Sequence, residues 1–196
     1  MYSFIKQDVA LPLFGLPTIA SALNIAVNLY GENILVEILA KPEAAVHDLS
    51  VINRLLMDIH RWYRSVLPKK QLQPVLPYER AQPPGYGQLC GCTTQLVGAG
   101  VYGTLIAPLD NELLGVYEHG GMIHLCGRHS HLIPVFRSMP NLKAVQINDR
   151  AASDLELYFS GLREDQIVYL MPFEGMTVKT AIKITGGKRL VIIDKI

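Results

Sequence analysis

Short apolar runs recur at regular intervals in the second half of the chain and constrain its fold more than any other feature. The runs cover residues 122–126, 142–148, 166–171 and 189–194, and helical stretches at 131–139, 151–162 and 177–184 separate them. The runs begin 20 to 24 residues apart, which is the spacing of βα units. They show little polar alternation, as expected for strands of a parallel sheet that is covered on both faces. The sequence therefore predicts an α/β fold.

Two further strands are predicted in the first half of the chain, at residues 9–14 and 86–89. Between them, Pro42 opens a helix with three/four apolar spacing that extends to about residue 66. Residues 67–84 are rich in proline and predict a loop. The chain thus has six predicted strands, whereas a closed (β/α)8 barrel of the TIM type has eight strands and about 250 residues. We expect an incomplete TIM-type barrel of about six βα units.

Composition limits both the number of domains and the partners. With 196 residues, of which 49% are hydrophobic, residues 1–196 are expected to form a single domain. The formal net charge is +1 and no run of one sign is longer than Lys69-Lys70, so neither nucleic acid nor an anionic membrane is an expected partner. Residues 9–30 are uncharged, but prolines and asparagines interrupt them, which favours a strand followed by a buried helix over a membrane span.

The chain has three cysteines, Cys90, Cys92 and Cys126. An odd number does not match the even set of cysteines in a small secreted disulfide protein. A reducing, cytoplasmic location is the simpler expectation. Their spacing also indicates a metal site. His124 and Cys126 lie two apart on a predicted strand and so share one face, and Cys90 and Cys92 have the same spacing at the end of the preceding strand.

Four nitrogen and sulfur ligands could thus converge, and zinc is the metal that prefers them. A catalytic zinc keeps three protein ligands and one open position. His124, Cys126 and one of Cys90 or Cys92 would meet that count. The alternative is that the cysteines are small buried apolar side chains and that His124 is a hydrogen-bonded core histidine. His129 and His131 extend the motif, but at a helix start we expect them to be solvated or capping residues.

Four blocks together resemble the uroporphyrinogen decarboxylase superfamily, which also contains corrinoid-linked and cobalamin-independent methyltransferases. Their order and spacing match the family from about its third barrel strand to its eighth and cover nearly all of the chain. The blocks are residues 11–21 (LPLFGLPTIAS), 41–43 (KPE), 85–94 (GYGQLCGCTT) and 120–127 (GGMIHLCG).

The resemblance implies a barrel with its site at the carboxyl ends of the strands. It places the site at residues 14–17, 89–94, 124–131, 148–150 and 172–174 and after residue 193. The substrate-binding residues that we expect there are Phe14, Pro17, Thr93, Asn148, Arg150 and Glu174.

The His-x-Cys motif of His124 and Cys126 is similar to the zinc motif of the methyltransferase branch. In that branch zinc holds a thiol substrate as the thiolate that attacks a methyl donor. The resemblance therefore implies methyl transfer to a small thiol from a corrinoid, a corrinoid protein or another donor. Those enzymes take a further cysteine from near the last strand, but residues 188–196 contain none, and Asp194 is the oxygen donor that could replace it.

Decarboxylation of a tetrapyrrole carboxylate is the alternative that the other branch implies. It requires cationic groups to hold carboxylates and an acid–base group to protonate carbon. Arg128 and Arg150 each follow a strand and could clamp a carboxylate, although surface salt bridges would explain them too. Asp149 could serve as the acid–base group or simply cap the next helix.

The chain departs from the decarboxylase pattern in other ways. The family's first strands are not matched, Leu23 stands where a tyrosine is expected, and the sequence ends before the expected histidine. A further alternative is a non-catalytic partial barrel that a partner polypeptide or a second copy completes, because unpaired strand edges invite pairing. A homodimer is the assembly that this alternative predicts.

Overall fold

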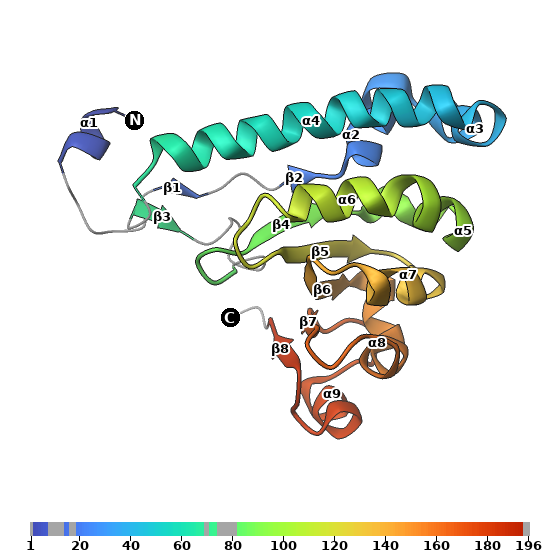
Figure 1. Cartoon of the computed structure of the whole chain (residues 1–196). Coiled ribbons are helices and arrows are strands. Elements are labelled where there is room, and N and C mark those ends of the chain that lie inside the picture. The colour runs from blue at the N-terminus through green and yellow to red at the C-terminus, as the bar shows by residue number, and fades with distance from the viewer. Residues whose placement is uncertain (1, 8–13, 16–18, 69–70, 74–81, 194–196) are drawn as a thin grey trace.

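The computed structural model describes residues 2–7, 14–15, 19–68, 71–73 and 82–193, and all structural statements below concern these residues. Strands and helices alternate along most of this part of the chain (Figure 1). The strands are β1 (Phe14–Gly15), β2 (Ile19–Ala20), β3 (Leu72–Gln73), β4 (Gly87–Cys90), β5 (Gly121–Cys126), β6 (Leu142–Asn148), β7 (Ile167–Leu170) and β8 (Leu190–Ile192). The α-helices are α1 (Tyr2–Lys6), α2 (Ala22–Tyr30), α3 (Asn33–Ala40), α4 (Pro42–Val66), α5 (Ala99–Val101), α6 (Ala107–Leu114), α7 (Ile133–Ser138), α8 (Leu155–Gly161) and α9 (Val178–Thr185). Other helical turns are η3 (Cys92–Leu96), η4 (Tyr102–Ile106), η5 (Ser130–Leu132) and η6 (Asp149–Asp154).

Six of the strands form one parallel sheet with the order β2-β4-β5-β6-β7-β8. Each new strand is added beside the one before it, and α6, α7, α8 and α9 run along one side of the sheet (Figure 1). This arrangement is compatible with part of an α/β barrel. Within the described ranges β2 and β8 are the outer strands, and no pairing between them closes the sheet.

The two faces of the sheet have different side chains because neighbouring residues of a strand point to opposite faces. On β5, Ile123 and Leu125 belong to the hydrophobic core that the helices cover. Met122, His124 and Cys126 alternate with them and therefore lie on the other face, which we call the inner face. Polar residues at every second position of otherwise apolar strands thus mark the face that carries the candidate site.

The long helix α4 (Pro42–Val66) has the bounds that the sequence predicts. Pro42 fits the first turn because the amide that it lacks would have no partner within the helix. Buried apolar residues along one side, including Leu49 and Met57, hold the helix against α2, α3 and α6. Its buried Asn53 donates to the carbonyl of Leu109 at 3.2 Å, which fixes α4 against α6.

The four later strands confirm the βα pattern. β6 has the predicted bounds, and β5, β7 and β8 differ from prediction by one or two residues at their ends. The helix expected after residue 21 is α2, for which Ser21 accepts a capping hydrogen bond from the amide of Asn24 at 3.1 Å. The fold class is therefore α/β, as predicted.

The first predicted strand, at residues 9–14, falls mostly outside the described residues. Residues 9–13 lie outside the described ranges, and Phe14–Gly15 form β1, which pairs with β3 in a separate two-stranded sheet. The edge of the main sheet is instead β2. The two-residue strand β3 also lies within the stretch predicted as a loop, and the helical segments η3 to α6 were not predicted.

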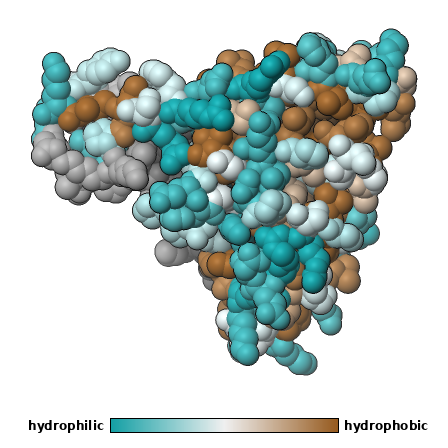
Figure 2. Space-filling view, in the orientation of Figure 1, coloured by the Kyte–Doolittle hydropathy of each residue, from teal (hydrophilic) through white to brown (hydrophobic). Residues whose placement is uncertain are grey.

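Apolar surface gathers over the end of the molecule formed by α2 to α6, whereas the tip at α9 is mainly hydrophilic (Figure 2). Leu29, Val36 and Leu39 on α2 and α3 are among the exposed apolar side chains. In the described part of the chain, none of the helices has both the length and the apolar character needed to cross a membrane.

Candidate metal centre

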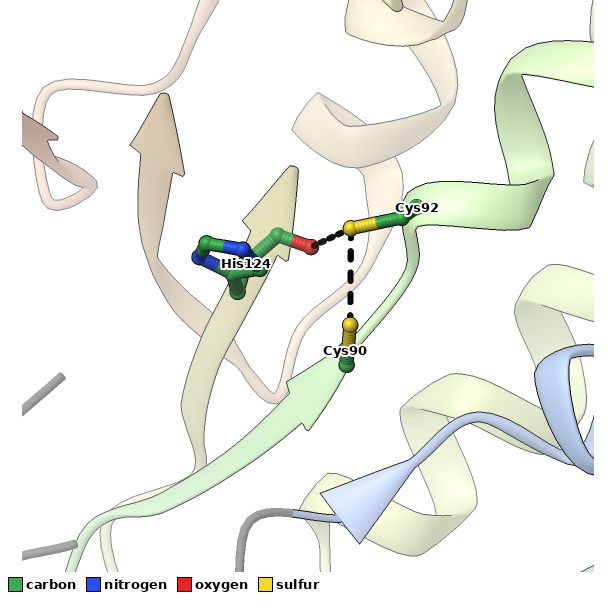
Figure 3. Close-up of side chains that lie close together, drawn as sticks. All are labelled: Cys90, Cys92 and His124. Atoms are coloured by element: carbon green, nitrogen blue, oxygen red, sulfur yellow. Dashed lines mark hydrogen bonds between the residues drawn. The ribbon is translucent and has the colours of Figure 1, made fainter. Parts of the chain in front are cut away.

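Three potential metal ligands meet where β4 and β5 run side by side (Figure 3). Cys90 is the last residue of β4, and its register partner on β5 is His124. Cys92 follows one glycine later, as the first residue of η3. The backbone turns back towards β5 there, because the amide of Gly91 donates to the carbonyl of His124 at 2.9 Å. Strand pairing thus positions all three side chains.

The ligand atoms of Cys90, Cys92 and His124 all lie within 4.8 Å of one another. The Sγ atoms of Cys90 and Cys92 are 3.4 Å apart. Two sulfurs bound to one tetrahedral zinc, at Zn–S distances of 2.3 Å, would lie about 3.8 Å apart. Changes of a few tenths of an ångström would therefore bring the two sulfurs to zinc-binding geometry.

A neighbouring amide orients the imidazole of His124. Its Nδ1 lies 2.8 Å from Oε1 of Gln146, the register partner of His124 on β6. An amide oxygen only accepts, so the Nδ1 proton points at Gln146 and Nε2 carries the lone pair. Metal-binding histidines are usually held by such a second hydrogen bond. His124 is also only 1% exposed, so the ring is both buried and fixed.

Cys126 adjoins the three ligands from the end of β5. Its Sγ lies 3.1 Å from Nε2 of His124. A side-chain hydrogen bond with Cys92 lowers the pKa of Cys126, while burial and Asp149 oppose this effect. For Cys90 the hydrogen bond with Cys92 and burial raise the pKa. The cluster therefore differs from the expected set, because both Cys90 and Cys92 join His124 and Cys126 is an adjacent fourth group.

Asn24 fixes the turn that carries Cys90 and Cys92. Its Oδ1 accepts from the backbone amide of Thr93 at 3.2 Å, and its Nδ2 points at Sγ of Cys90 at 3.7 Å. Ser21, the cap of α2, donates to the same Oδ1 at 3.1 Å, and its backbone amide donates to the carbonyl of Cys90 at 3.0 Å. The amino end of α2 thus holds the cysteine turn in place.

Two of the expected substrate-binding residues lie next to the cluster. Thr93 directly follows Cys92 and is half-buried. Asn148 ends β6 opposite Cys126; its Nδ2 points at Sδ of Met171 at 3.7 Å, and its buried Oδ1 has no hydrogen-bond partner among the described residues. Both residues therefore adjoin the cluster, Thr93 along the chain and Asn148 across the sheet.

Asp149, an expected catalytic residue, directly follows β6 and is exposed, with a φ of +48°. This left-handed backbone is uncommon for a residue other than glycine and often occurs at functional sites. The proximity of its carboxylate raises the pKa of Cys126, against the lowering effect of Cys92. Asp149 is the first residue of η6, and the cap position before it is Asn148, so Asp149 is not the cap of this helical turn.

The remaining expected residues are spread more widely. Arg128 and Arg150 are exposed in the segments that follow β5 and β6, and the exposed Glu174 lies in a turn with a φ of +29°. Phe14 belongs to β1, outside the main sheet. Pro17 and Asp194 lie outside the described residues.

The two histidines after Cys126 differ in their surroundings. His129 is fully buried, and burial lowers its pKa, so the expectation of a solvated residue is wrong. Its Nδ1 lies 3.4 Å from the carbonyl of Gly127. His131 is exposed, as expected, with Nε2 3.0 Å from the carbonyl of Val97.

Sequence reasoning missed the amides that surround the cluster, namely Asn24, Gln88 and Gln146. The signal for two of them is the alternation on the strands: Gln88 is two residues before Cys90, and Gln146 is two residues before Asn148. Chemically, two thiols and one oriented imidazole form a donor set that suits zinc. Comparison of the chain with protein-family models, with curated proteins and with solved structures found no match.

Proposed function

We propose that the chain is a protein of the uroporphyrinogen decarboxylase superfamily that binds zinc and transfers a methyl group to a thiol. The methyl donor would be a corrinoid, carried by a partner protein or free, or another small methylated molecule. The observation that carries the proposal is the convergence of Cys90, Cys92 and His124 within 4.8 Å, with Nδ1 of His124 occupied by Gln146.

The donor set supports zinc over harder metals. Thiolates and imidazole suit zinc, whereas magnesium and calcium require oxygen ligands. Cys90 and Cys92 would bind as thiolates and His124 through the neutral Nε2. The two negative charges of the thiolates would then balance the double positive charge of the zinc ion. A fourth position would remain for Cys126 or for a substrate.

The position of the cluster supports a catalytic role. In barrels of parallel strands the active site lies at the carboxyl ends of the strands, where Cys90 and Cys126 are found. Zinc in such a site keeps a bound thiol deprotonated at neutral pH. The residues of this chain would hold that thiolate against Thr93 and Asn148, and Asp149 is placed beside Cys126 to accept the released proton.

Metal analysis of the purified chain tests the first half of the proposal. We expect close to one zinc per chain in the parent and loss of zinc in Cys90→Ser and His124→Ala. His47→Ala, which changes an exposed histidine of α4, is the matched control and should keep the metal. A parent chain that stays metal-free after exposure to zinc would refute the metal centre.

A methylation assay tests the second half. The zinc-loaded chain is mixed with methylcobalamin and a small thiol, and the methyl thioether is measured by mass spectrometry. We expect turnover that His124→Ala abolishes. Zinc binding without methylation of any thiol would reject methyl transfer and leave a structural metal site.

Decarboxylation receives less support from the arrangement. The cations that it needs, Arg128 and Arg150, are exposed, and the cluster itself is neutral. A tetrapyrrole with several carboxylates would require more positive charge near the inner face than these two residues provide.

A further inference from the structure

Gln88 is a buried amide whose hydrogen-bonding capacity is unused. It is 0% exposed, and neither its Nε2 nor its Oε1 has a hydrogen-bond partner among the residues that the structure describes. Buried polar groups are almost always paired, and each one left unpaired lowers stability. Both halves of this one amide are unpaired, so the fold carries an unfavourable group that a ligand would satisfy.

Gln88 lies directly beside the metal centre. It precedes Cys90 by two residues on β4, so both side chains are on the inner face. Its register partner on β5 is Met122, which precedes His124 by two residues. The amide is therefore one level below the metal ligands, a step of about 6.6 Å along the strands.

The surroundings of Gln88 suit a small, uncharged group. The next strand, β6, contributes Ala144, which is the register partner of Met122. The side chain of Ala144 is a single methyl group and so fills little space beside Gln88. Met122 is flexible and can change its rotamer to make room. Neither neighbour carries a charge that would compensate a buried carboxylate.

The unpaired donor and acceptor of Gln88 define the chemistry of the ligand. A partner group must offer one acceptor and one donor on adjacent atoms, as a carboxamide does. A carboxylate has no donor and would bring an uncompensated charge into this level. A thiol bound at the metal could reach the amide through a short aliphatic chain, given the spacing between the two levels.

We propose that Gln88 recognises the carboxamide of a thiol substrate whose sulfur binds at the centre of Cys90, Cys92 and His124. This inference rests on the proposed metal centre and names the substrate class of the same site. Gln88 is then a specificity-determining residue, and two hydrogen bonds to it distinguish a thiol carboxamide from an alkyl thiol.

Binding of three thiols to the cobalt-loaded chain tests the inference, because cobalt in a thiolate site reports ligand binding by its absorption. The probes are 3-mercaptopropionamide, 3-mercaptopropionate and 1-butanethiol. We expect the carboxamide to bind at least about 10-fold more tightly than the other two, as two neutral hydrogen bonds in a buried site would give. In Gln88→Met the three affinities should become similar, with unchanged metal content and unchanged affinity for 1-butanethiol.

Two results would overturn the inference while the metal centre stands: equal affinities of the parent for the three thiols, or a carboxamide preference that survives in Gln88→Met. Failure of the proposed function has a different signature, since a chain that binds no cobalt, or whose cobalt responds to none of the thiols, lacks the centre itself. If Gln88→Met fails to fold, the three-thiol comparison on the parent still decides the question.

Discussion

The hydrogen bond between His124 and Gln146 couples the metal ligand to the neighbouring strand. Nδ1 of His124 lies 2.8 Å from Oε1 of Gln146, and both side chains are buried. Such a bond fixes the orientation of the ring and the nitrogen that carries the proton. The strength of metal binding should therefore depend on residue 146 although its side chain is not a proposed ligand.

Gln146→Leu should lower the affinity for zinc by about 10- to 100-fold, the usual effect of removing such a second bond. Gln146→Glu keeps an acceptor oxygen and should retain most of the affinity. Competition with a chromophoric chelator measures both. Equal affinities of the parent and Gln146→Leu would show that the ring is held by other contacts.

A second buried polar pair makes stability depend on pH. Tyr102 donates to Oδ2 of Asp110 at 3.0 Å, and within the described part of the chain the other oxygen of Asp110 has no hydrogen-bond partner. Burial raises the pKa of Asp110 from 3.8 to about 7. Because the folded state binds the proton more tightly than the unfolded chain, the contribution to stability is full below pH 4 and is lost as the pH rises to about 7.

Asp110→Asn should remove this dependence, since its amide cannot ionise. The free energy of unfolding of the variant should exceed that of the parent most above pH 7. The difference there is at most about 4 kcal/mol for a pKa shift of this size. At pH 4 the two proteins should differ little. Urea unfolding at pH 4.5 and pH 8 measures the difference, and a gap that does not grow with pH would contradict the assignment.

At the scale of elements, tight turns before the strands set how closely neighbouring strands approach. Gly120 precedes β5 with a φ of +73°, and a Cβ there would lie 2.2 Å from the carbonyl oxygen of Asn141. The carbonyl of Gly120 also accepts from the amide of Gly87 at 2.8 Å, at the start of β4. A side chain at residue 120 would therefore push the start of β5, the strand that carries His124, away from the segment that leads into β6.

Gly120→Ala and Gly186→Ala form a matched pair that separates backbone strain from this clash. Gly186 ends α9 with a φ of +62°, but a Cβ there would have nothing within 4 Å. We expect Gly186→Ala to cost about 1–2 kcal/mol from the backbone alone, and Gly120→Ala to cost at least about 1 kcal/mol more from overpacking. Equal losses in urea unfolding would show that the turn before β5 adjusts freely.

The elements also show what the sequence could and could not predict. Helix α4 was predicted with its bounds because its apolar spacing persists over 25 residues and a proline marks its start. β2 has only two residues, too short for a period to be visible, so it was not predicted. Segments η3 to α6 were missed because short helical turns, including a π-helical one at η4, interrupt any regular spacing.

The candidate site could be predicted in part for a related reason. Parallel strands bring their carboxyl ends together, so the spacing of Cys90, Cys92, His124 and Cys126 was enough to place these side chains near one another. The contacts of Asn24 and Gln146 depend on packing between segments far apart in the chain, and no local pattern reveals them.

At the scale of the whole molecule, the described sheet has two outer strands, β2 and β8, which lie at opposite ends of the strand order. Val191 on β8 is 36% exposed, although it is an apolar residue of a strand. Outer strands that are neither charged nor covered tend to pair with strands of another chain. We therefore expect the purified chain to form a dimer in which the outer strand β8 takes part.

Val191→Lys should weaken this association, because a lysine on an outer strand opposes pairing by its charge and by the desolvation that pairing would require. The change is at a partly exposed position, so the free energy of unfolding of the monomer should change by less than about 1 kcal/mol. Size-exclusion chromatography with light scattering, over a range of protein concentrations, measures the association of both forms. A parent chain that stays monomeric with a cooperative melt would show that the six-stranded sheet is stable alone, and the metal centre would then have to function with residues from a single chain.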